Sequence, residues 1–186
     1  NLMGGKNVVS GEGSSDNPEV ISWQPSGLSG GGGMFTPAIS PADSQLMMLN
    51  CDMSAAYISE DGGRNWRMIN YAQLQTDTRC KPCFHPTNPD IIYASSRGDL
   101  KISRDRGYTF TSFGGFTQRP YGEIAVHPGN TDIMLVGLYG GGCMISPDGG
   151  NTWSKCDGPQ GMLQGFVFDR TSESQGEVMF AGTDQG

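Results

Sequence analysis

A nine-residue pattern occurs three times along the chain at a nearly constant interval. The copies share the form I-S-x-D-x-G-x-[TN]-[WF] and occupy residues 58–66, 102–110 and 145–153. Their aspartates, Asp61, Asp105 and Asp148, stand 44 and 43 residues apart. This interval is the repeat length of a propeller blade and not of a short solenoid repeat. The chain is therefore predicted to be a run of similar blades.

Each copy, called a box below, has the residue types of a strand, a turn and a second strand. An Asp side chain accepts hydrogen bonds from N–H groups of its own turn, glycines permit the positive φ angles of a tight turn, and the final aromatic residue begins a strand that packs inward. We expect the box residues to shape turns and to do no chemistry. These structural residues are Ser59, Asp61, Gly63, Trp66, Ser103, Asp105, Gly107, Phe110, Ser146, Asp148, Gly150 and Trp153.

The boxes resemble the Asp-box (BNR) repeats of sialidases, sortilin-type receptors, photosystem assembly factors and several glycoside hydrolases. The resemblance implies an all-β fold, a β-propeller built from blades of four antiparallel strands, and it says little about activity. A sialidase is disfavoured, because the [FY]-R-I-P motif of those enzymes is missing and residues 117–120 match it poorly.

Chain length limits how much of a ring is supplied. Propellers close with about four to eight blades, and a ring of seven blades needs roughly 300 residues, whereas this chain has 186. We expect about three and a half blades, either as a fragment of a propeller of about seven blades or as a protomer that completes its ring with other chains. The expected organisation is a flexible arm at 1–20 and a partial propeller at 21–186, with blades at approximately 34–70, 80–113, 121–156 and, incomplete, 165–186.

Charge and composition disfavour some partners. The formal net charge is −7 and the pI is near 4.6, whereas nucleic acids and anionic membranes call for a basic face. No apolar run approaches the roughly eighteen residues that could span a membrane. A neutral or cationic ligand is compatible with this composition.

The cysteines and histidines do not have the spacing of a metal site. The C-x-x-C run at 80–83 has no second copy and the chain has only two histidines, so neither zinc nor another cofactor is expected. Cys143 and Cys156 flank the third box, and a hairpin there would permit a disulfide, although two buried thiols are the commoner outcome. His85 and His127 hold the same repeat position before a turn and are predicted to be structural.

Strand alternation assigns the loops to two rims. If the four strands of a blade are named A to D, the A–B turns and the boxes fall on one rim, and the B–C loops and D-to-A connections fall on the other. Pockets are expected on this second rim, called the mouth below. Asp52 lies there in the first blade, where the next two repeats have Ser96 and Tyr139, so a carboxylate is not expected to be part of the repeat.

The run from Trp23 to Trp66 resembles the opening of the double-propeller xyloglucanases of glycoside hydrolase family 74. The family's Trp-containing strand, glycine run, h-P-type turn and T-D-x-G-G-A-Y-R motif correspond here to Trp23 and to residues 30–35, 40–41 and 51–58. The resemblance implies that Asp52 is the general base of an inverting hydrolase, whose second carboxylic acid comes from another propeller. Ser54, Ala55 and Ile58 replace the family's Gly-Gly and Arg, which adds side chains where a sugar would approach. A looser T-D-x-G match recurs at residues 183–186.

The mouth around Asp52 offers the aromatic faces and polar groups that a carbohydrate cleft requires. The candidate substrate contacts are Tyr71, Arg79, Arg97, Phe116, Arg119 and Tyr139. Tyr121 is also a candidate, and inter-blade packing is an equally good interpretation of it.

Two functions fit these features. In the first, the chain is part of a secreted or periplasmic polysaccharide-active glycoside hydrolase, similar to a xyloglucanase or endoglucanase, and is inactive alone. In the alternative it belongs to a non-catalytic propeller that binds a glycan or a protein. The expected partners are a polysaccharide or oligosaccharide and the remaining blades or a second propeller, with no nucleic acid and no membrane insertion.

Overall fold

The computed structural model describes residues 3–7, 21–25, 32–53, 55–78, 80–96, 98–169 and 179–185, with side chains from residue 32 onward. These residues form strands and turns, and no helix is found among them. In this described part of the chain there is accordingly no helix long and apolar enough to cross a membrane.

Three four-stranded antiparallel sheets make up most of the structure. In each sheet the strands pair in sequence order, so every sheet is a meander. The first has β3 (Met34–Ile39), β4 (Met47–Cys51), β5 (Ala56–Ser59) and β6 (Arg67–Met68). The second has β7 (Pro82–Phe84), β8 (Ile92–Ser96), β9 (Asp99–Ser103) and β10 (Thr111–Phe113). The third has β11 (Pro120–Val126), β12 (Met134–Leu138), β13 (Cys143–Ser146) and β14 (Ser154–Lys155). The predicted all-β fold of four-stranded blades is confirmed.

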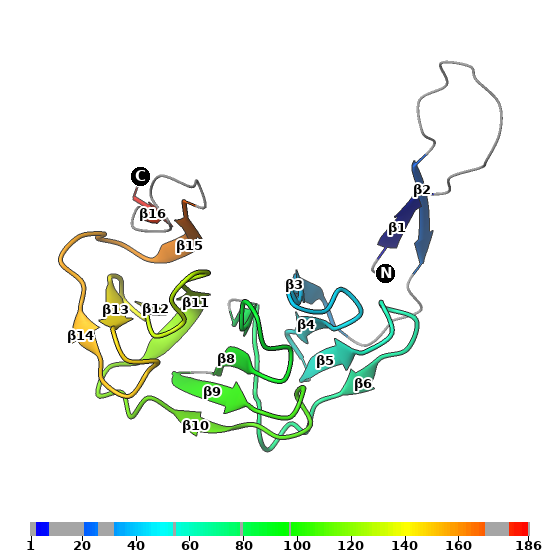
Figure 1. Ribbon diagram of the computed structural model, residues 1–186, viewed down its shortest axis with the longest axis horizontal. Coiled ribbons are helices and arrows are strands. Elements are labelled where there is room, and N and C mark those ends of the chain that lie inside the picture. Colours follow the sequence, from blue (N-terminus) through cyan, green and yellow to red (C-terminus); the bar gives the residue numbers. More distant parts are fainter. Residues whose placement is uncertain are drawn as a thin grey trace, which may run out of the picture.

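Two further sheets have two strands each. They pair β1 (Met3–Asn7) with β2 (Ile21–Pro25), and β15 (Leu163–Phe168) with β16 (Met179–Thr183). Figure 1 shows the sheets following one another along an open arc, with β15 and β16 at one end and β1 and β2 at the other. The contacts of β3 with β7, of β7 with β11 and of β11 with β15 place these four first strands side by side along the inner wall of the arc.

The strand β1 differs from the expectation of an arm over residues 1–20. Residues 3–7 lack any apolar alternation, and sequence pattern therefore gave no signal for a strand. Their pairing with β2, from Met3 opposite Pro25 to Asn7 opposite Ile21, is a backbone ladder. Such a ladder can form without an amphipathic pattern, because its hydrogen bonds come from the main chain.

The apolar core lies between neighbouring blades. One cluster joins the first and second sheets and includes Met48, Ile58, Leu74 and Ile92. The other joins the second and third sheets and comprises Tyr93, Leu100, Ile102, Ile124, Val126, Met134 and Val136. All five residues of β8 and all five of β12 are buried, since these strands are covered by a sheet on each face. The blades are thus held in position by face-to-face packing.

The three boxes fold in the same way. In the first, Ser59 Oγ donates to Asp61 Oδ1 at 2.9 Å and accepts from Gly63 N at 2.9 Å, while Asn65 N donates to Asp61 Oδ1 at 2.8 Å. The equivalent three distances are 2.7, 2.7 and 2.8 Å in the second box and 2.9, 2.8 and 2.8 Å in the third. Hydrogen bonds from Asn65, first its N–H and then its side chain, lower the pKa of Asp61 to about 2. These contacts are those expected of turn-forming aspartates.

Each box ends in an aromatic residue, as the pattern requires. Phe110 is buried in the first cluster. Trp66 and Trp153 are half-buried, and each indole N–H donates to the carbonyl of its box glycine at 3.0 Å. Trp153 also packs against the second cluster. Phe110 and Trp153 therefore connect their turns to the inter-blade core.

Both histidines shape A–B turns. His85 Nδ1 accepts from Thr87 N at 3.3 Å and Asn88 N at 3.1 Å. His127 Nδ1 accepts from the N–H groups of residues 129 and 130 at 3.0 and 2.8 Å. Burial lowers the pKa of His85, which favours the neutral ring that can accept at Nδ1. These are the contacts of structural histidines.

Candidate functional site

The two expected rims are present. On one, the boxes bind the A–B turns of the same sheets: Gly62 N donates to Gln45 O at 2.9 Å, and Gly149 N donates to Asp132 O at 2.8 Å. On the mouth, the B–C loops form hydrogen bonds with the connections that lead into each sheet. Asp52 follows β4 in a B–C loop, so it lies on the mouth, away from Asp61.

Asp52 is held by the glycine run that precedes β3. Gly33 N donates to Asp52 Oδ1 at 2.9 Å, and Asp52 N donates to Gly33 O at 3.3 Å. A methyl group on Gly32 would lie 2.5 Å from Asp52 Oδ1 and 2.9 Å from Cys51 Sγ. The Asp52 side chain is partly exposed. Glycine is therefore needed at position 32 to let the chain approach this carboxylate.

The contact made by Asp52 recurs in other blades. Asp184, after β16, accepts from Met162 N at 2.8 Å through Oδ1 and donates from its own N to Met162 O at 3.1 Å. Ser96 occupies the same position in the second blade, and its Oγ donates to Gln75 O at 2.8 Å and accepts from Gln75 N at 3.2 Å. In the third blade Tyr139 N donates to Arg119 O at 3.0 Å. The expectation that a carboxylate is foreign to the repeat was wrong, because Asp184 makes the same clamp as Asp52.

A connected group of side chains extends along the mouth from the second blade to the third. Tyr121 OH donates to Asp77 Oδ2 at 3.2 Å, and the rings of Tyr121 and Tyr139 meet edge to face at 5.4 Å. The Arg119 guanidinium lies 4.9 Å from the centre of the Tyr139 ring. Thr76, next to Asp77, donates to Cys51 O at 3.4 Å. The loop that carries Asp52 is thereby linked to the aromatic pair.

The other predicted contact residues lie apart from this group or outside the described residues. Tyr71 is 44% exposed on the connection between the first two blades. Phe116 is half-buried and packs on Trp153 with ring centres 4.8 Å apart, so it belongs to the inter-blade packing. Arg79 and Arg97 are outside the described residues. The structure thus brings Arg119 and Tyr139 together with Tyr121.

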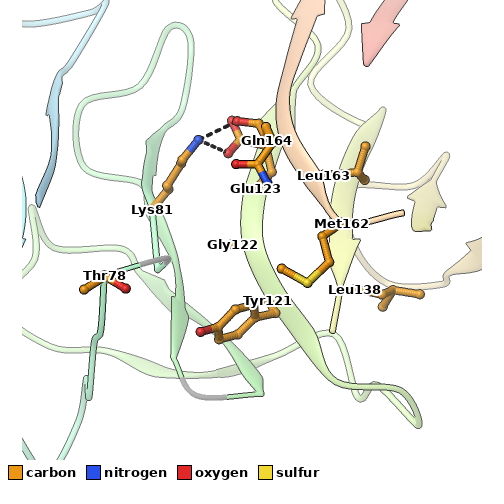
Figure 2. A pocket seen from close by; sticks show the side chains of 9 residues that line it. All are labelled: Thr78, Lys81, Tyr121, Gly122, Glu123, Leu138, Met162, Leu163 and Gln164. Atoms are coloured by element: carbon orange, nitrogen blue, oxygen red, sulfur yellow. Dashed lines mark hydrogen bonds and ion pairs between the residues drawn. The ribbon is translucent and has the colours of Figure 1, made fainter. Parts of the chain in front are cut away.

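A pocket of about 100 Å³ opens beside the aromatic pair, between the first strands of three blades. Figure 2 shows Lys81 pointing toward Glu123 and Gln164, with Tyr121 and Met162 on the other side of the space. Lys81 forms an ion pair with Glu123, and its Nζ donates to Gln164 O at 2.8 Å. Burial raises the pKa of Glu123, although Lys81 opposes the shift.

Sequence reasoning missed the pair of Lys81 and Glu123. The available signal was positional: each stands four residues before the turn histidine of its repeat, and the two charges are opposite in neighbouring blades. Equivalent positions of adjacent repeats lie side by side on the inner wall, so opposite charges there indicate an inter-blade ion pair.

The cysteines of the C-x-x-C run do not act together. Cys80 Sγ donates to Asp77 Oδ1 at 3.4 Å, and Cys83 Sγ donates to Phe84 O at 3.8 Å. Within the described ranges no group of three or more His, Cys, Asp or Glu side chains could hold a metal ion.

Comparisons with known proteins place this geometry in context. No family model matches the chain. An oligoxyloglucan-reducing end-specific xyloglucanase from Emericella nidulans is 28% identical over an alignment of 183 positions, which covers 84% of this chain and 22% of the relative. Among solved structures, an ancestral GH74 enzyme gives a TM-score of 0.69 at 20% identity, covering 88% of this chain and 23% of the other. The GH74 enzyme of Niastella koreensis gives 0.66 at 22% identity, covering 89% and 26%.

The chain spans about a quarter or less of the length of these proteins. The resemblance extends over most of the described blades and agrees with the meander topology and the open arc. In sequence and fold, this chain is similar to part of a propeller of the glycoside hydrolase family 74 enzymes.

Proposed function

We propose that this chain is part of a secreted or periplasmic polysaccharide-active glycoside hydrolase, in which Asp52 is the general base of an inverting reaction. The observation that carries the proposal is the placement of Asp52. It lies on the mouth, partly exposed, with one carboxylate oxygen fixed by Gly33 N at 2.9 Å. A general base must be fixed in position and reachable by the water that it activates. The similarity to a xyloglucanase supports a polysaccharide of the xyloglucan type as the substrate.

The aromatic pair supports the same proposal. Tyr139 is 58% exposed, its ring is nearly perpendicular to that of Tyr121, and the Arg119 guanidinium lies over it. The exposed part of a ring held in this way can contact a sugar. Under this proposal the polysaccharide runs along the mouth, from Asp52 toward Tyr139.

Inverting hydrolysis needs a second carboxylic acid, about 6.5–9.5 Å from the base. Under the proposal that acid belongs to a second propeller of a longer protein, so the chain alone binds substrate and does not hydrolyse it. The base on this chain would take a proton from water as the water attacks the anomeric carbon. The acid would protonate the departing glycosidic oxygen.

Hydrolysis of xyloglucan by the longer protein tests the proposal. Asp52→Asn keeps a side-chain oxygen for Gly33 N and removes the base, so kcat should fall by about 10²- to 10⁴-fold with little change in KM. Asp184→Asn is the matched control, because Asp184 makes the same clamp in another blade, and it should keep the activity. Proton NMR of the first product should show the inverted anomer. Equal activity of Asp52→Asn and wild type would refute the proposal.

A second candidate, a non-catalytic propeller that binds a glycan, is favoured by the recurrence of the clamp. Asp184 and Ser96 make the contact of Asp52 at the equivalent positions of other blades, so a structural role is sufficient to explain a carboxylate at position 52. This candidate predicts that the wild-type longer protein and its Asp52→Asn variant bind oligosaccharides equally well. Neither protein should hydrolyse them.

A further inference from the structure

Cys143 and Cys156 stand directly opposite each other across the hairpin of the third box. In the pairing of β13 with β14, Met144 faces Lys155 and Ile145 faces Ser154. One step outward in this register, Cys143 faces Cys156, and Cys156 N donates to Cys143 O at 2.9 Å. The two cysteines are therefore a hydrogen-bonded cross-strand pair at the open end of the hairpin.

The backbone separation of this pair suits a disulfide. The Cα atoms of a hydrogen-bonded antiparallel pair are about 5.5 Å apart, and disulfides span Cα distances of about 4.4–6.8 Å. Both cysteines are thiols in this structure. Burial first, and then the interaction with the Cys156 side chain, raises the pKa of Cys143 to about 12.

The same repeat position in the other blades carries no thiols. It is held by Ala56 and Ile69 in the first blade, where Ile69 N donates to Ala56 O at 2.9 Å. In the second blade Leu100 faces Phe113. An apolar pair is sufficient for packing at this position. The two cysteines of the third blade can in addition form a disulfide.

The remaining cysteines contact other groups. Cys51 Sγ lies 3.9 Å from Asp52 Oδ1, and Cys80 and Cys83 bind Asp77 and the carbonyl of residue 84. Cys143 is 2% exposed, whereas Cys156 is half-buried. An incoming oxidant therefore reaches Cys156 first.

We propose that Cys143 and Cys156 form a disulfide that fastens the base of the third box hairpin. The oxidant is a disulfide of a small thiol or of a thiol oxidoreductase. The Cys156 thiolate attacks it, which forms a mixed disulfide and releases one thiol. The Cys143 thiolate then displaces the second thiol and forms the Cys143–Cys156 bond, so one disulfide is reduced to two thiols as two cysteines are oxidised. This proposal does not depend on the proposed hydrolase function.

The test oxidises the reduced, folded chain with glutathione disulfide at about pH 8, where the thiolate fraction is larger. Remaining thiols are then alkylated and the protein is analysed by mass spectrometry. The expected result is three alkylated cysteines, a crosslinked peptide joining residues 143 and 156, and a rise in Tm. A crosslink between other cysteines, five alkylated thiols, or glutathione retained on Cys156 would overturn the proposal.

A matched variant keeps the test sound if single substitutions fail to fold. Cys143→Ala with Cys156→Ile installs the pair of the first blade, which this fold already accommodates. It should fold with the box intact and show no change in Tm on oxidation. If the variant gains as much Tm as wild type under glutathione disulfide, the stabilisation arises elsewhere and the proposal fails.

Discussion

Arg106 occupies the position in the second box where the other two boxes have glycine. Its φ is +58°, close to the +70° of Gly62 and the +67° of Gly149. The side chain reaches the first blade, where its nitrogens lie 2.7 Å from Asp43 Oδ2 and 3.1 Å from Glu60 Oε1. We expect the positive φ of Arg106 to destabilise the fold and its ion pairs with the first blade to offset this strain.

The magnitude follows from three contributions. The two ion pairs, with side chains about 30% exposed, should each stabilise the fold by about 0.5–1 kcal/mol. Arg106→Ala should therefore lower the free energy of unfolding by about 1–2 kcal/mol, or Tm by roughly 2–8 °C. A left-handed φ destabilises alanine at position 106 by about 1–2 kcal/mol relative to glycine. The greater freedom of glycine in the unfolded chain offsets about 0.4–1 kcal/mol of this advantage. Arg106→Gly should thus be more stable than Arg106→Ala by about 0.8 kcal/mol, the middle of a range of about 0–1.6 kcal/mol.

Urea unfolding of the chain measures these differences in the free energy of unfolding. The two single variants Asp43→Asn and Arg106→Ala, together with their double variant, give the coupling energy between Arg106 and Asp43. At about 1 M salt the loss in Arg106→Ala should shrink, because the Debye length falls to about 3 Å. Gly149→Ala is the control for strain alone, since its new methyl group would meet only Asp132 Oδ1 at 3.5 Å. If Arg106→Ala is as stable as wild type, or Arg106→Gly is less stable than Arg106→Ala, the reasoning is refuted.

Two further predictions concern the boxes. The pKa of Asp61 is about 2 against an ordinary 3.8, and hydrogen bonds from Thr152 lower the pKa of Asp148. The pKa values in the folded protein therefore lie below those in the unfolded chain. The stability that these two aspartates contribute should be full above about pH 4 and decline as pH falls toward 2. Tm measured from pH 2 to 6 checks this, and a maximum below pH 3 would contradict it. Ser146→Ala leaves the buried N–H of Gly150 without its acceptor and should lower the free energy of unfolding by about 1–3 kcal/mol. Ser154→Ala, on the exposed β14, should change the free energy of unfolding little. Equal losses for the two variants in urea unfolding would contradict the role of the box serine.

The repeat made the blades predictable. The spacing of Asp61, Asp105 and Asp148 indicates both the number of box hairpins and the meander around each, because Asp, Gly and an aromatic residue act locally within one turn. The cross-strand position of Cys143 and Cys156 follows from the same local geometry. Residues 3–7 gave no such signal, since their pairing depends on a backbone ladder with a segment that follows fourteen or more residues later.

The sequence by itself determined the fold class, the two rims and the position of Asp52 on the mouth, because a strand's alternation and its turns are properties of neighbouring residues. Only the tertiary structure decided what Asp52 touches. Its Oδ1 accepts from Gly33 N, which precedes β3, and Asp184 Oδ1 accepts in the same way from Met162 N, which precedes β15. The pairing of Lys81 with Glu123 likewise depends on how adjacent blades pack, which no single repeat encodes.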